Sequence, residues 1–115
     1  MKKIGIVTFA LLCPMLADAG WVKGMVDGFY VTPTDLRVSV TGAGAGTCSS
    51  WNYEFRLPNT STQYEDILAT VIAAHISKVD TTVWYTDSTA PGTTQTNGCT
   101  ESSMAVITAL GMADF

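Results

Sequence analysis

The segment 62–78 most constrains the fold of this chain, because its apolar residues follow a helical period. They recur at intervals of three and four residues: Tyr64, Ile67, Leu68, Val71, Ile72, His75 and Ile76. This spacing predicts an amphipathic helix with one face against a core. Thr62 and Glu65 have the spacing of a capping box, which satisfies backbone N–H groups at a helix start. We therefore expect one helix, packed against what the rest of the chain forms.

Five other segments have the length and composition of strands, and most of them alternate apolar with polar positions: 20–31, 36–41, 51–57, 79–85 and 105–112. Glycines within the first segment predict a bend or bulge there. Three strands, one helix and two strands, in that order, predict a small β-rich α+β domain with an OB-like five-stranded barrel. The alternative is an open antiparallel sheet with one packed helix.

The first 19 residues have the pattern of a secretory signal peptide. Lys2 and Lys3 precede the apolar run 4–12, and Ala17 and Ala19 bracket an A-x-A cleavage site. The run is shorter than the roughly 20 residues that span a bilayer. We expect residues 1–19 to be removed and residues 20–115 to form one secreted or periplasmic domain without membrane insertion.

Cys13 raises the alternative of a lipid-anchored protein, in which this cysteine would be acylated. Leu12 is bulky where such signals prefer a small residue, and Pro14 follows directly. The secretory signal peptide is therefore the favoured interpretation.

Two cysteines, Cys48 and Cys99, remain after the signal peptide. An even pair in an exported chain predicts a disulfide. A bridge closing a loop of about 50 residues stabilises by about 4 kcal/mol in the chain-entropy model. The only histidine, His75, is distant from both cysteines, so no paired metal-ligand spacing exists. We expect a disulfide, no metal site and no cofactor.

The chain resembles the B-subunit-like domains of subtilase-type and typhoid-type bacterial toxins and their small secreted relatives. The residues that carry this resemblance cover most of the mature chain: Cys48, Tyr64 to Ile76, Thr82 to Tyr85, Cys99 and Ala105 to Leu110. The resemblance implies an OB-type barrel, self-assembly into a homopentamer and glycan binding on the face of the ring. It assigns no glycan-contacting residue, because no segment matches the toxin subunits' sugar-binding segment.

Charge and residue inventory disfavour two other classes of function. The formal net charge is −4, with no clustered basic patch to bind nucleic acid. Glu65 and Asp66 are adjacent on the predicted helix and point in different directions, so they form no facing carboxylate pair. His75 lies on the apolar stripe, where a structural role is favoured over that of a catalytic base. We expect no enzyme, and a small hydrolase is the least favoured hypothesis.

Three aromatic residues are the candidates for binding a ligand or a neighbouring subunit: Trp51, Trp84 and Tyr85. Aromatic side chains are enriched at recognition surfaces because they bury much area at a small entropy cost. Trp84 occupies the polar register of its strand, so it is expected to face outward unless a loop or a subunit covers it. The favoured hypothesis is a secreted non-catalytic binding module for a glycan or protein receptor. The alternative is a monomeric periplasmic interaction or inhibitor protein without glycan affinity.

Overall fold

The computed structural model describes residues 19–43 and 47–112. Apart from Ala19, the predicted signal peptide lies outside these residues, as does part of the glycine-rich loop. The elements follow the order β1 (Ala19–Val31), β2 (Asp35–Val40), β3 (Phe55–Pro58), α2 (Tyr64–Ser77), β4 (Asp80–Thr86), η2 (Glu101–Ser103) and β5 (Ala105–Gly111).

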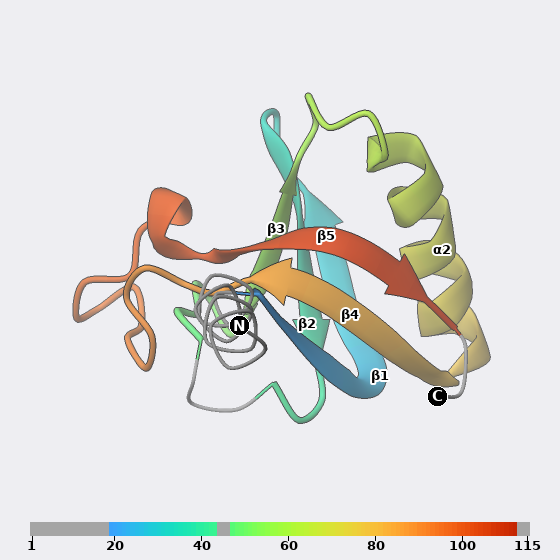
Figure 1. Ribbon diagram of the computed structural model, residues 1–115, viewed down its shortest axis with the longest axis horizontal. Helices are drawn as coiled ribbons and strands as arrows, with labels where there is room; N and C mark the ends of the chain where they lie inside the picture. Colours follow the sequence, from blue (N-terminus) through green and yellow to red (C-terminus); the bar gives the residue numbers. More distant parts are fainter. Residues whose placement is uncertain (1–18, 44–46, 113–115) are drawn as a thin grey trace, which may run out of the picture.

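The five strands close into a ring in the order β1-β2-β3-β5-β4 (Figure 1). Neighbouring strands pair antiparallel, except that β3 and β5 are parallel. The β3–β5 ladder has only two residue pairs, Phe55 with Ala105 and Arg56 with Val106, so the ring is irregular there. The predicted OB-like arrangement, with a helix between the third and fourth strands, is confirmed. The open-sheet alternative is wrong, because β4 also pairs with β1 along seven positions.

The core lies inside the ring and is made by alternate positions of the strands. Leu36, Val38 and Val40 of β2 point inward, as do Phe55 and Leu57 of β3, and all five are buried. Fully burying a side chain of this kind contributes about 1.5–3 kcal/mol. The two-residue period predicted from the sequence therefore decides which side chains form the core.

Helix α2 covers one end of the ring and contacts β1 and β5 (Figure 1). It buries Ile67, Val71 and Ala74, spaced as one face of a helix. The predicted apolar face was too wide, because Ile72 and Ile76 are 39% and 74% exposed. One side of a helix suffices to cover the end of a small ring, so the neighbouring stripe stays in solvent.

The predicted capping box is absent. The helix begins at Tyr64 with Gln63 as its N-cap, and no side chain caps it. A turn ahead of the helix uses the backbone instead, since the N–H of Tyr64 donates to the carbonyl of Ser61. Thr62 therefore lies before the N-cap, and its hydroxyl lacks the position that a capping box needs.

His75 has a structural contact of a different kind from the one expected. Its Nδ1 donates to the carbonyl oxygen of Val26 in β1 at 3.1 Å, rather than to a carbonyl at the helix end. Its ring also meets Phe29 edge-on, with ring centres 5.6 Å apart. His75 thus joins α2 to β1.

The third strand begins later than predicted. Trp51 and Asn52 form a turn with φ angles of 55° and 68°, and Ser50 and Tyr53 exchange backbone hydrogen bonds across it. The N–H of Ser49 donates to the carbonyl of Thr93, which attaches this segment to the β4–β5 loop. These contacts with a distant loop override the local alternation, so β3 starts at Phe55.

The predicted disulfide between Cys48 and Cys99 is confirmed, with Cα atoms 5.4 Å apart. Both cysteines are buried and form a small second core with Met104. The bridge joins the segment before β3 to the β4–β5 loop, at the end of the molecule away from α2 (Figure 1). Such a disulfide is consistent with a location outside the cytoplasm.

Candidate functional site

The outward face of β1, β2 and β3 carries a connected group of polar and aromatic side chains. Strand register places Tyr30, Arg37 and Arg56 in one row across the three strands. Two hollows open on this face. The Trp51 hollow, of about 280 Å³, is lined by Asp27, Gly28, Ser39, Trp51, Asn52 and Tyr53. The Arg56 hollow, of about 310 Å³, is lined by Arg56, Thr100, Glu101 and Ser102.

A β-bulge in β1 aims Asp27 at the Trp51 hollow. Val26 pairs with Val40, and Gly28 pairs with Ser39, so Asp27 is the extra residue between them. A bulge of this kind redirects a side chain without ending the strand. The hydroxyl of Thr41 donates to the Asp27 carboxylate at 2.8 Å and holds it.

The glycine after the bulge opens the hollow. A Cβ atom at Gly28 would lie 3.1 Å from the hydroxyl oxygen of Tyr53. Glycine at this position therefore leaves room for the phenol to lie over β1. The bend predicted at a glycine is thus seen as a bulge next to Gly28, and its consequence is the placement of Asp27 and Tyr53.

Trp51 stands at the edge of its hollow and is 69% exposed. Its positive φ angle and that of Asn52 are rare for residues with a side chain, and they cost of order 1 kcal/mol or more each. The N–H of Trp51 donates to the side-chain oxygen of Gln95 at 3.0 Å, in the loop that Cys99 joins to Cys48. A strained turn that is held from several sides presents a large indole ring at small further entropy cost.

Tyr30 lies between Tyr53 of the Trp51 hollow and Arg37, which in turn contacts Glu101 of the Arg56 hollow. Its ring meets Tyr53 edge-on, with ring centres 4.8 Å apart, which is a favourable aromatic geometry. Its hydroxyl oxygen accepts a hydrogen bond from Nη1 of Arg37 at 3.1 Å. The aromatic and the charged parts of the face are therefore contiguous.

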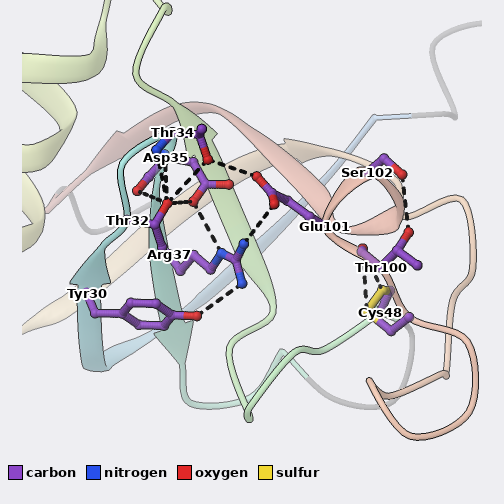
Figure 2. Close-up of polar contacts among 10 residues, drawn as sticks. Tyr30, Thr32, Thr34, Asp35, Arg37, Cys48, Thr100, Glu101 and Ser102 are labelled. Carbon is purple, nitrogen blue, oxygen red and sulfur yellow. Dashed lines mark hydrogen bonds and ion pairs between the residues drawn. A yellow bond between two sulfur atoms is a disulfide. The ribbon is translucent and has the colours of Figure 1, made fainter.

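Arg37 is the centre of a charged network (Figure 2). Its Nε lies 3.2 Å from Oδ1 of Asp35, and its Nη2 lies 3.2 Å from Oε2 of Glu101. The hydroxyl of Thr32 donates to Asp35 at 2.6 Å, and that of Thr34 donates to Glu101 at 3.1 Å. The network joins β2 to η2 in the β4–β5 loop.

The network keeps its buried carboxylate ionised. Burial by itself raises the pKa of Asp35, but the hydrogen bond from Thr32 and the charge of Arg37 outweigh it and lower that pKa. Burial also disfavours the charged form of Arg37 and by itself lowers its pKa. Contacts with Tyr30 and Asp35 more than compensate, so the pKa of the guanidinium is raised. Both groups are charged over the whole physiological range.

The three aromatic candidates lie at different places. Trp51 belongs to the face just described. Trp84 is half-buried on the outside of the ring, opposite Trp21 in the pairing of β1 with β4. Tyr85 points inward and packs on Phe55, with ring centres 4.9 Å apart. Of the three, Trp51 lines one of the two hollows described on this face.

Several residues of the face were not identified from the sequence, namely Asp27, Tyr30, Tyr53 and Arg56. Arg37 and Arg56 have a signal in their strand patterns, because both occupy polar positions between buried ones. That pattern predicts exposure and not proximity. Asp27 has no such signal, since its direction depends on the bulge. Trp21, which is 62% exposed, was also not identified, because the prediction of a strand over 20–31 did not assign which of its side chains face outward.

Compared with family models, curated proteins and solved structures, the chain matches none. Within residues 19–43 and 47–112, no helix is long and apolar enough to cross a membrane. In the same residues, no three side chains of His, Cys, Asp or Glu gather as metal ligands.

Proposed function

We propose that this chain is an exported, non-catalytic glycan-binding module whose sugar site is the Trp51 hollow. The observation that carries the proposal is an indole ring, 69% exposed, on a turn anchored to the disulfide-linked loop and beside a polar hollow. A sugar ring has apolar C–H faces and a rim of hydroxyl groups. Trp51 supplies an aromatic surface for such a face.

The polar groups of the Trp51 hollow suit the hydroxyl rim. Asp27 accepts hydrogen bonds, while Asn52 and the hydroxyl of Ser39 can each donate and accept. OB-folds bind oligosaccharides and oligonucleotides through the face of strands 2 and 3 and the adjoining loops. Here Asp27 and the net charge of −4 oppose a phosphate backbone, so the sugar is favoured over the nucleic acid.

The resemblance to toxin B subunits extends the proposal to a homopentamer that presents several copies of the hollow. Several weak sites on one assembly raise the apparent affinity without any new contact. Trp21 and Trp84 support self-association, because they are cross-strand neighbours on the outside of the ring. Trp21 is 62% exposed there, an unusually large apolar side chain to leave in solvent.

A glycan array followed by titration of the hits tests the glycan site. The wild type should bind a defined group of glycans, and Trp51→Ala should weaken that binding by about 10- to 100-fold, as expected for an aromatic anchor. Trp51→Phe keeps an aromatic ring and should recover part of the affinity. Ile76→Ala removes a similarly exposed apolar side chain from α2 and should leave binding unchanged.

Two results would overturn the glycan proposal. One is a Trp51→Ala variant that binds the hits as the wild type does. The other is a wild type that binds no glycan and is monomeric by native mass spectrometry, which would favour a periplasmic interaction or inhibitor protein.

A further inference from the structure

Arg56 lies in an unusual electrostatic position on β3. It pairs with Arg37 across the β2–β3 ladder, so two guanidinium groups occupy neighbouring positions of one face. Like charges at directly opposed positions of a sheet are destabilising unless they are compensated. Arg37 is compensated, since its three nitrogens contact Asp35, Tyr30 and Glu101.

Arg56 lacks this compensation. Its Nε is buried and has no hydrogen-bond partner among the described residues. A buried donor without a partner destabilises the fold, and does so more strongly when the group is charged. Such an exception in a folded protein requires a physical explanation.

The Arg56 hollow supplies the remaining parts of a binding site. Thr100 and Ser102 lie on its wall and share a hydrogen bond of 3.2 Å between their hydroxyl oxygens, so the hydroxyl that accepts it keeps its own proton to donate to a ligand. Glu101 also lines the hollow, but one of its oxygens is held by Arg37 and the other by Thr34 (Figure 2). Its charge is thus directed to Arg37.

We propose that the Arg56 hollow binds an oxyanion group, a carboxylate or a sulfate. Arg56 supplies the planar, permanently charged donor that matches two oxygens of such a group. The hydroxyl of the Thr100–Ser102 pair that keeps its proton donates to an oxygen that the guanidinium leaves free. The bound group compensates the charge of Arg56, which the described protein side chains leave uncompensated. This site is separate from the Trp51 hollow and does not depend on glycan binding there.

NMR titration of the full mature domain tests the site directly, because the Nε–H group of Arg56 has its own signal. The probes are sodium sulfate and sodium glucuronate at constant ionic strength, with sodium chloride and glucose as controls. The Arg56 signal, assigned by its absence in Arg56→Gln, should move and saturate with sulfate or glucuronate. It should not saturate with either control.

Three variants distinguish specific anion binding at Arg56 from a nonspecific effect of added ions on the charges of the protein. Arg56→Gln should weaken binding at least 10-fold, as seen from the backbone amide signals of Thr100 and Ser102. Arg56→Lys keeps the charge without the planar fork and should bind with intermediate affinity. Lys78→Gln removes one charge from the end of α2 and should bind as the wild type does.

The two probes also distinguish the source of the group. Tighter binding of glucuronate identifies an oxyanion carried on a sugar, and tighter binding of sulfate identifies a free anion. The proposal is overturned if neither probe gives a saturable shift, or if Arg56→Gln titrates as the wild type does. Glycan-array results on Trp51→Ala bear only on the other hollow, so the two proposals fail separately.

Discussion

At the scale of single residues, glycines decide how closely strands approach in the ring. A Cβ atom at Gly24 would overlap the carbonyl oxygen of Thr41, a backbone atom of the neighbouring strand end. The N–H of Thr41 in turn donates to the carbonyl of Met25 at 2.9 Å. The glycine therefore allows a hydrogen-bonded contact that any side chain would force apart.

Gly24→Ala should lower the free energy of unfolding by about 1–3 kcal/mol, because backbone must move to admit the methyl group. Gly111→Ala is the matched control, since a Cβ atom there meets nothing within 4 Å. It should change stability by less than about 0.5 kcal/mol. Chemical denaturation of both variants checks the prediction, and equal stability of the two would contradict it.

At the scale of elements, the network around Arg37 joins β2 to the β4–β5 loop, which carries η2 and Gln95. Its members come from the consecutive strands β1 and β2 and from η2, which lies much further along the chain: Thr34 and Glu101 are 67 residues apart. The loop is long and polar, and loops of that kind are uncommon in compact domains unless they are functional. Here it is held by the disulfide, by Glu101, and by the hydrogen bonds that Thr93 and Gln95 accept from the segment before β3.

The network around Arg37 makes the free energy of unfolding fall at acid pH. Because the pKa of Asp35 is lowered in the folded state, its stabilising contribution is present above its ordinary pKa of 3.8. That contribution is lost as the pH falls through the lower, folded-state pKa. Asp35→Asn should therefore cost about 2 kcal/mol at neutral pH and flatten the acid limb of the stability profile.

Glu54 provides a control of opposite sign. Burial raises its pKa, although the N–H of Val40 donates to its carboxylate at 3.0 Å and opposes the shift. Its ionisation therefore destabilises the fold as the pH rises above its ordinary pKa of 4.5. Glu54→Gln keeps an acceptor for Val40 and should raise stability at neutral pH. The free energy of unfolding of Asp35→Asn and Glu54→Gln, measured by denaturation from neutral pH to about pH 2, checks both predictions. A change of the same sign in both variants at neutral pH would contradict them.

At the scale of the whole molecule, the ring removes most free strand edges but leaves large apolar side chains outside. Trp21 and Trp84 lie together on β1 and β4. Ile72 and Ile76 lie on the outer side of α2. Because closing the ring pairs most backbone N–H and C=O groups of the strands, few remain to pair with a strand of another chain. We therefore expect subunits to associate through side-chain contacts.

If the chain assembles through β1 and β4, Trp84→Ala and Trp21→Ala should each lower the mass measured by light scattering. The physical reason is the loss of a large apolar contact at the centre of an interface. Ile76→Ala should leave the mass unchanged. A monomeric wild type, or tryptophan variants of full mass, would rule out this mode of assembly.

The sequence predicted the elements and their order well, because its signals for them are local. The two-residue period of 36–41 identified the buried side of β2, and the three-to-four spacing of 62–78 identified α2. The disulfide was predictable because two cysteines allow one pairing once export is assumed. Where a local signal misled, a competing local turn prevailed at Thr62, and contacts with the distant β4–β5 loop prevailed at Trp51.

Local patterns in the sequence thus specify the parts of the ring: five strands in order, one helix, one disulfide and the apolar side of each strand that faces inward. The candidate site, in contrast, is assembled by contacts between segments that are far apart along the chain. The bulge that aims Asp27, the turn that exposes Trp51 and the register that places Arg56 beside Arg37 all depend on pairing between distant segments. A one-residue change of register would turn these side chains to the other face, and no local pattern specifies register by itself.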